Sequence, residues 1–149
     1  MATTYSFKDL SGAFTHPLTT PYVFAGKIGL GQITISMSTD KSVHDVSADG
    51  SVMISAIPGD HGHVAIEAQQ TSDLHAFLLS WYNLIKTAMD AGDLTNWATA
   101  SMTLRNLVDG SVHTITGISP AKIPDKTYAA QGGKITWTLM AADIQSVTA

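Results

Sequence analysis

Apolar and polar residues alternate one by one along much of this chain, and this pattern restricts what the chain can fold into. In segment 32–38, Ile33, Ile35 and Met37 alternate with small polar residues. Successive side chains of a β-strand point to opposite faces, so this segment predicts a strand with one buried face. The same pattern recurs in six further segments: 43–47, 51–57, 63–68, 99–107, 112–117 and 134–141. We expect a mainly β protein of about eight strands.

Two Asp-Gly pairs mark turns between consecutive strands. Asp49-Gly50 and Asp109-Gly110 each separate two alternating segments. Such a pair favours a β-hairpin turn, because glycine readily adopts the positive φ that the turn requires. Hairpin connections join antiparallel strands, so we expect an antiparallel β-sandwich or barrel.

One segment has a helical period instead. Between residues 74 and 88, apolar residues recur in steps of three and four, which places them on one helix face. Ser72 is positioned to cap the N-terminus of this helix, and Gly92 to end it. We expect one helix flanking the sheet, anchored in the core by six residues: Leu74, Phe77, Leu78, Trp81, Leu84 and Ile85.

The remaining segments are expected to be less regular. We expect a single domain over residues 1–149 that starts with an N-terminal segment, 1–10. The Gly-, Pro- and Thr-rich segment 11–31 is predicted to be a loop or arm. Segment 142–149 is predicted to be a C-terminal tail.

The chain has unusually few charges for a soluble domain. Charged residues make up 13% of it, where about 25% is usual. The mean hydropathy is +0.13, yet no apolar run is long enough to span a membrane, so no membrane insertion is expected. The net charge of −4 argues against a nucleic-acid-binding protein, which carries a basic patch. Such a chain covers its surface with small residues or with copies of itself, and the second option indicates an assembly protein.

Residues able to do chemistry are few and scattered, and we predict no catalytic, cofactor or metal site. His61 and His63 would face the same way on a strand, but two imidazoles are too few for a tight metal site. A helix cap explains Ser72, Asp73 and His75 better than a catalytic triad does. A triad is defined by the positions of its residues in space, so their closeness in the sequence is no evidence for one. We therefore expect no enzyme; a small metal- or ligand-binding β-domain stays as a minor alternative.

The order of several segments resembles the tail tube proteins of contractile-tailed bacteriophages. The matching segments are 2–10, 33–37 with Asp40-Lys41, 48–53, the helix, and 124–137 with Gly132-Gly133. The resemblance covers nearly the whole chain and brings no active site with it. It implies a β-sandwich with a flanking helix, whose inner sheet joins those of neighbouring copies in a ring-shaped barrel. Ring closure removes the exposed sheet edges.

The resemblance also implies a function. It implies a structural virion protein that polymerises as stacked hexameric rings into the inner tail tube, which conducts phage DNA into the host. The implied partners are other copies, the tail sheath, the tape-measure protein, the baseplate and the tail terminator, and DNA passes without specific binding. The protein would be made in the host bacterial cytoplasm and end in the virion. Another tail completion or terminator protein, or the tube of an injection machine, is the alternative.

Within this hypothesis, two groups of residues are expected to make the important contacts. A wall that does not hold DNA should be neutral or acidic, and residues 36–60 have four aspartates against one lysine. We therefore expect segment 32–57 to line the channel, with four residues facing it: Thr34, Ser36, Asp40 and Asp45. Contacts between rings are expected from five residues: Tyr5, Phe7, Lys8, Asp49 and Gly50. A turn alone would also explain Asp49.

Overall fold

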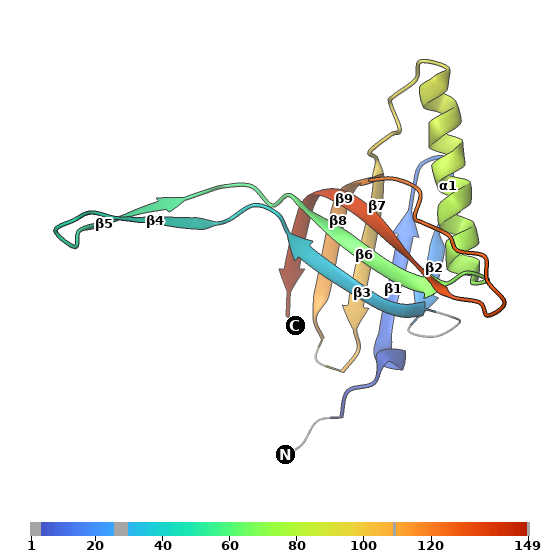
Figure 1. Ribbon diagram of the computed structural model, residues 1–149, viewed down its shortest axis with the longest axis horizontal. Coiled ribbons are helices and arrows are strands. Elements are labelled where there is room, and N and C mark those ends of the chain that lie inside the picture. Colours follow the sequence, from blue (N-terminus) through green and yellow to red (C-terminus); the bar gives the residue numbers. More distant parts are fainter. Residues whose placement is uncertain (1–3, 26–29, 109, 149) are drawn as a thin grey trace.

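The structure is a computed structural model that describes residues 4–25, 30–108 and 110–148 (Figure 1). Within these ranges the chain forms nine strands, one α-helix and a short 3-10 helix. In chain order they are η1 (Phe7–Asp9), β1 (Leu10–Thr15), β2 (Tyr22–Ala25), β3 (Leu30–Met37), β4 (Ser42–Val46), β5 (Val52–Ala56), β6 (Gly62–Gln69), α1 (Asp73–Asp90), β7 (Ala100–Asn106), β8 (Val112–Pro120) and β9 (Lys134–Val147). The predicted mainly β fold with one flanking helix is confirmed.

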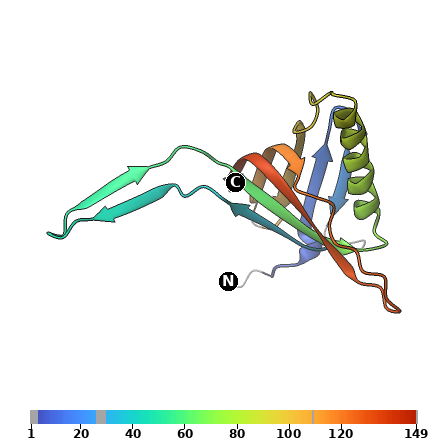
Figure 2. The same ribbon diagram turned by 45° about the horizontal axis from the view of Figure 1, so that its top comes forward.

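Seven strands form one antiparallel sheet in the order β2-β1-β7-β8-β9-β6-β3. The sheet is curled into a half-barrel, and α1 covers one side of it (Figures 1 and 2). The other two strands, β4 and β5, pair only with each other. They form a hairpin that projects far from the sheet between β3 and β6. We call residues 38–61 the arm.

The predicted loop at 11–31 is wrong. This segment contains most of β1, all of β2 and the start of β3. β1 pairs with β7, from Leu10 opposite Asn106 to Thr15 opposite Ser101. The glycines, prolines and threonines of this segment hid the alternation, and the pairing partner lies far away in the sequence. Residues 26–29 of the predicted loop lie outside the described residues.

The predicted C-terminal tail at 142–149 is also wrong. β9 continues to Val147, where it pairs with Val112 at the start of β8. The polar residues at the end of this strand are stabilised by backbone pairing with β8 rather than by burial. An alternating apolar pattern therefore could not reveal them.

A glycine lets β8 bend within the sheet. β7 and β8 shift register between Ala100 and Met102, opposite a stretch of β8 that includes Gly117. Gly117 has a φ of 66°, and a Cβ there would collide with the side chain of Ala142. Such a bulge bends the strand and increases its twist, which helps the sheet to curl.

The inner face of the sheet, which carries the buried residues, packs against α1. Phe14 of β1 lies edge-on to Trp81 of α1, with ring centroids 5.1 Å apart, and both are fully buried. Five of the six predicted helix anchors pack in this core: Leu74, Phe77, Leu78, Trp81 and Ile85. Leu84 does not, because it lies on the flank of the helix stripe and is 39% exposed.

A buried hydrogen bond also joins the helix to the sheet. The Trp137 Nε1–H of β9 donates to His75 Nδ1 of α1 at 3.1 Å, and both residues are buried. Burial and the nearby positive charge of Lys126 hold the pKa of His75 below its usual value. Ser72 Oγ accepts a hydrogen bond from the His75 backbone N–H, so the predicted N-cap is confirmed. Gly92, with a φ of 87°, follows the C-cap residue Ala91.

The different burial of two helix leucines predicts different contributions to stability. Leu78→Ala should lower the free energy of unfolding by about 2–5 kcal/mol, because the side chain is fully buried in the core. Leu84→Ala should cost about 1 kcal/mol or less, because this side chain is partly in water. Urea unfolding followed by circular dichroism measures both, and equal losses would contradict the packing described here.

The His75–Trp137 hydrogen bond predicts acid sensitivity. Because the pKa of His75 is lower in the folded protein than in the unfolded chain, acidification protonates the unfolded chain first. Stability is therefore fully present above about pH 6.5 and is lost as the pH falls towards the folded pKa of His75. His75→Gln, which keeps an acceptor but cannot titrate, should reduce this loss between about pH 7 and pH 5 in urea unfolding. His113→Gln is the control, and an unchanged pH dependence in His75→Gln would refute the assignment.

Candidate assembly interface

The arm is the most exposed part of the molecule. All ten residues in its two strands, β4 and β5, are exposed. The exposed fractions of Val46 and Ile54 are 65% and 63%. A two-stranded hairpin alone in water has marginal stability, and exposed apolar surface of this kind marks an interaction site. The arm is therefore a candidate interaction surface.

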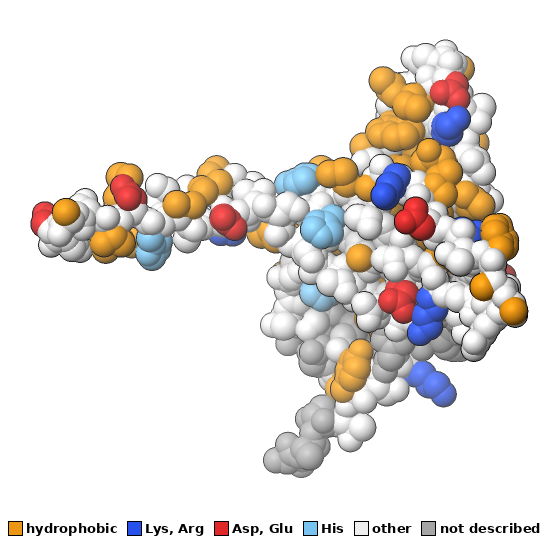
Figure 3. Space-filling view, viewed as in Figure 1, with side chains coloured by type: hydrophobic (Ala, Val, Ile, Leu, Met, Phe, Trp, Pro, Cys, Tyr) orange, Lys and Arg blue, Asp and Glu red, His pale blue; other side chains and the backbone are white. Residues whose placement is uncertain are grey.

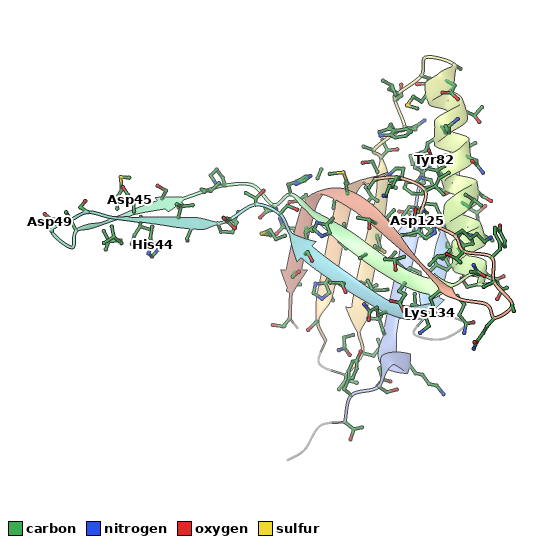
Figure 4. All side chains as sticks on the ribbon, viewed as in Figure 1. His44, Asp45, Asp49, Tyr82, Asp125 and Lys134 are labelled. Atoms are coloured by element: carbon green, nitrogen blue, oxygen red, sulfur yellow. The ribbon has the colours of Figure 1, made fainter. Side chains whose placement is uncertain are left out.

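The two faces of the arm differ. The register places Val46 opposite Val52 and His44 opposite Ile54, so these four residues share one face. Asp45 lies opposite Met53 on the other face, next to the pair formed by Val43 and Ser55. Figure 4 shows His44 and Asp45 pointing to opposite sides of the arm. Hydrophobic side chains follow the arm along its length (Figure 3). We call the surface of Val46, Val52 and Ile54 the aliphatic face of the arm.

The base of the arm is held by hydrogen bonds and an ion pair. The Ser38 backbone N–H donates to the carbonyl of His61 at 2.9 Å. Lys41 Nζ donates to Asp60 Oδ1 at 3.1 Å and to the Gly59 carbonyl at 2.8 Å. The hydrogen bond from Lys41 lowers the pKa of Asp60. These contacts tie the two sides of the arm together where it leaves the sheet.

At the tip of the arm, Asp49 and Gly50 form the predicted hairpin turn. Gly50 has a φ of 89°, and Asp49 Oδ1 accepts a hydrogen bond from the Ser51 backbone N–H at 2.9 Å. This hydrogen bond lowers the pKa of Asp49. The aspartate thus has a structural role in the turn, whatever contacts it makes with another copy. The second predicted turn includes Asp109, which lies outside the described residues.

The long edge of the sheet is unprotected. β3 has eight residues and pairs only with β6 among the described strands. It contains no charged residue and no proline, which are the features that usually keep an edge strand from pairing with another chain. Its free backbone groups can therefore continue the sheet into a neighbouring copy. The opposite edge, β2, is shorter, with four residues.

The four residues expected to face the channel do not share one surface. Thr34 and Ser36 lie on the outer face of β3, in the rows that contain Ala65 and His63 of β6. Asp40 and Asp45 lie on the arm, outside the sheet, and both are exposed. The alternation in segments 43–47 and 51–57 belongs to a separate hairpin, so sequence periodicity alone could not separate the two surfaces.

The outer face of β3, β6 and β9 is polar but carries little net charge. Thr34, Ala65 and Thr138 form one row across the three strands. Its ion pair joins Lys134 Nζ to Glu67 Oε1 at 3.6 Å, and Lys134 is labelled near the start of β9 in Figure 4. Hydroxyl groups and a neutralised pair give little attraction for a phosphate backbone.

The predicted inter-ring residues lie in two separate places. Asp49 and Gly50 are at the tip of the arm, whereas Tyr5 and Lys8 belong to the N-terminal segment, which lies below the sheet in Figure 1. The side chain of Tyr5 is 65% exposed, and Lys8 is also exposed. The side chain of Phe7 lies outside the described part of the structure. The five residues predicted for contacts between rings therefore do not form one continuous surface.

A family comparison agrees with this architecture. The family model of the bacteriophage PhiTE tail tube protein matches residues 1–148. The chain belongs to this tail tube family. A search of curated protein sequences gives no match.

Solved structures with the same fold come from contractile injection systems. A chain of the anti-feeding prophage (AFP) baseplate matches with a TM-score of 0.61 and 14% identity, covering 99% of this chain and 97% of its own. A chain of the PVC sheath-tube complex of an extracellular contractile injection system has a TM-score of 0.55 and 11% identity, covering 93% and 88%. A chain of the AFP tube terminating cap has a TM-score of 0.54 and 8% identity, covering 100% and 95%. At these identities the likeness concerns the fold alone, and it supports the half-barrel with one helix.

Several residues considered for chemistry in this tail tube family member have structural partners. The ring of His75 accepts from Trp137, and Ser72 Oγ caps the helix, so these two residues form no hydrolytic pair. His63 Nδ1 lies 3.2 Å from Ser38 Oγ, and His61 is exposed before β6. Among the described residues, no three His, Asp or Glu side chains come together as metal ligands. No helix in the described ranges is long and apolar enough to cross a membrane.

Proposed function

We propose that this protein is the subunit of an inner tail tube, in which hexameric rings stack into a hollow cylinder that conducts phage DNA into the host. Its role is structural rather than enzymatic. The observation that carries the proposal is the arm: a long hairpin with every strand residue exposed and an aliphatic face. Membership of the tail tube family supplies the context.

The arm and the sheet edge suit two different directions of growth. The free edge of β3 lies at one side of the half-barrel, so continuation of the sheet there joins copies side by side. Repeating such a contact around an axis closes a ring with no exposed edge. The arm extends far beyond the sheet (Figure 2), so it can reach a copy that the sheet edge does not touch. We assign the arm and the N-terminal segment, including Tyr5, Phe7 and Lys8, to contacts between rings.

In this arrangement the outer face of β3, β6 and β9 lines the channel. Thr34 and Ser36 then face the DNA together with Thr138, and Lys134 is neutralised by Glu67. Asp40 lies at the root of the arm and Asp45 further along it, so they would add negative charge where rings meet. A wall of hydroxyl groups and carboxylates lets DNA slide without being held.

The proposed location and partners follow from the tube. The subunit is made in the cytoplasm of the host bacterium and is incorporated in the virion tail. Its outer surface meets the tail sheath, its channel first encloses the tape-measure protein, and its ends meet the baseplate and the tail terminator. Structural neighbours from baseplate and sheath-tube assemblies support this set.

A terminator or tail completion protein is the second candidate. The similarity to an AFP tube terminating cap and to a sheath/tube terminator favours it over any enzyme. A terminator forms one ring, whereas a tube subunit stacks without limit. Negative-stain electron microscopy of the purified protein over a concentration series separates the two, because only a tube subunit gives long hollow tubes.

Shortening the arm should abolish stacking but leave the body folded. Replacing residues 42–56 with a short Gly-Ser linker removes both arm strands but keeps the Ser38–His61 and Lys41–Asp60 contacts at the base. We expect a circular dichroism spectrum and urea unfolding of a folded body, and no tubes under the microscope. Tubes at the wild-type yield would overturn the assignment of the arm.

A point variant refines this test. Ile54→Ser, on the aliphatic face, should reduce tube formation strongly, because it removes apolar area that the assembly buries. Leu94→Ser is the matched control, since the exposed fractions of Leu94 and Ile54 are 61% and 63%. Equal effects of the two variants would show that the arm has no special role.

Deletion of residues 2–8 should leave a folded protein that polymerises poorly. The deletion removes the N-terminal segment before β1 but no strand of the sheet. Circular dichroism measures the fold, and tube yield by electron microscopy measures assembly. A wild-type yield from the truncated protein would contradict the proposed inter-ring role of Tyr5, Phe7 and Lys8.

The channel assignment has its own test. A cryo-electron microscopy reconstruction of the tube shows which strands line the channel. We expect Thr34 and Ser36 on the wall and no basic lining. A wall formed by other strands, or a basic wall, would refute this part of the proposal.

A further inference from the structure

A long loop joins β8 to β9, although these two strands are neighbours in the sheet. It spans residues 121–133 and contains no helix or strand. Two neighbouring antiparallel strands need only a short turn, and loops of this length are uncommon and usually functional. Neither the core nor the contacts proposed so far give this segment a role. We call residues 121–133 the β8–β9 loop.

Hydrogen bonds hold the β8–β9 loop against the body at its start, middle and end. The Ala121 backbone N–H donates to the Thr138 carbonyl at 3.1 Å. The side-chain Nε2 of Gln70 donates to the Thr127 carbonyl at 2.6 Å, and the Gln70 backbone N–H donates to the Gly133 carbonyl at 3.2 Å. The loop therefore presents its exposed side chains from a fixed backbone, which lowers the entropic cost of binding a partner.

The exposed side chains of this loop combine an aromatic ring with positive charge. Tyr128 is 82% exposed, more than any other large apolar residue in the described part of the chain. Lys126 Nζ lies over its ring, 5.2 Å from the centroid. The loop has two lysines, Lys122 and Lys126, against one acid, Asp125. Neither lysine belongs to an ion pair among the described residues, so both charges are available to a partner.

The arm carries the complementary combination of an apolar side chain with negative charge. On the face opposite the aliphatic face, Asp45 lies directly across from Met53, which is 62% exposed. We call this surface, formed by Val43, Asp45, Met53 and Ser55, the acidic face of the arm. Residues 38–61 contain four aspartates and one lysine, and that lysine, Lys41, pairs with Asp60. Asp45 belongs to no ion pair within the described ranges.

These two surfaces lie at opposite ends of the molecule. The arm extends from one side of the sheet, and the β8–β9 loop ends on the other side (Figures 1 and 2). Figure 4 labels Asp45 on the arm and Lys134, the first residue after the loop, across the body. The two surfaces therefore cannot meet within one copy. Complementary surfaces at opposite ends make a head-to-tail contact, which repeats from copy to copy in an open series.

We infer that the β8–β9 loop is the seat for the arm of a second copy in the next ring. The Asp45 carboxylate meets the Lys126 ammonium, and Met53 packs on the ring of Tyr128, a contact that sulfur and aromatic rings favour. The aliphatic face of the arm stays available for another neighbour. This inference rests on the proposed function, since it names the seat of the arm within the tube.

Exchanging the two charges tests the contact. Asp45→Lys should raise the protein concentration needed for assembly by about ten-fold, because it places a lysine against Lys126. Lys126→Glu should raise it similarly, because two carboxylates then meet. The variant with both substitutions restores opposite charges with their positions exchanged, so it should assemble near the wild-type concentration. Sedimentation of tubes over a concentration series measures all three.

A second double variant is the control for net charge. Asp45→Lys combined with Lys86→Glu has the same net charge as the exchanged pair, but Lys86 lies on α1 and pairs with Asp90. We expect no rescue from it. Urea unfolding checks that every variant is folded. Rescue by neither double variant, or equal rescue by both, would overturn the inference.

Disulfide trapping measures the same contact independently of charge, because the chain has no cysteine of its own. Tyr128→Cys and Met53→Cys subunits are mixed with wild-type subunits, so that tubes still form, and are then oxidised. The linked dimer is measured on a non-reducing gel. Ile54→Cys in place of Met53→Cys is the matched control: it is 63% exposed against 62%, but lies on the aliphatic face. We expect a strong product with Met53→Cys and a weak one with Ile54→Cys.

The failure of this inference differs from the failure of the proposed function. Wild-type tubes with no Met53→Cys product, or with equal products from the two arm positions, would overturn the seat of the arm and leave the tube standing. Wild-type protein that forms no tubes, alone or on a baseplate preparation used as a seed, would overturn the proposed function and the inference with it.

Discussion

The structure depends on the packing of one helix against the inner face of one curled sheet. Phe14 and Trp81 pack edge-on in this contact. The hydrogen bond from Trp137 to His75 also joins the sheet to the helix. The sheet buries its inner face in this way and leaves its outer face to polar side chains. The only α-helix in the described ranges covers one side of the sheet. No described element covers the arm or the free edge of β3.

This incomplete coverage links the fold to the function. A chain with 13% charged residues cannot hide all of its apolar surface under charged groups. The structure shows where part of the uncovered apolar surface lies: on the aliphatic face of the arm. Exposed apolar surface of this kind costs free energy in a single copy. In the proposed tube, contact with other copies would cover this surface.

Much of the sheet was predictable because burial follows the alternation of the sequence. The strands after residue 31 and the helix lie close to their expected places. β1 and β2 were missed, since glycine, proline and threonine obscure their alternation, and the end of β9 was missed because backbone pairing alone holds it. Leu84 was expected in the core because it belongs to the apolar stripe of the helix. The position of the helix over the sheet places this residue at the flank, and only packing reveals that.

Local sequence patterns were enough to predict the strand-rich fold, the helix with its Ser72 cap and the turn at Asp49-Gly50, and composition gave the scarcity of charge. All of these features depend on residues that are close together in the sequence, so their local preferences can be recognised without the structure. The tertiary structure alone decided that segment 42–56 leaves the sheet as an arm, so that Asp40 and Asp45 part from Thr34 and Ser36. It also brought His75 and Trp137 together in a buried hydrogen bond between the helix and the sheet. Contacts between residues so far apart depend on how the sheet curls and where the helix packs, and a local pattern contains no record of either.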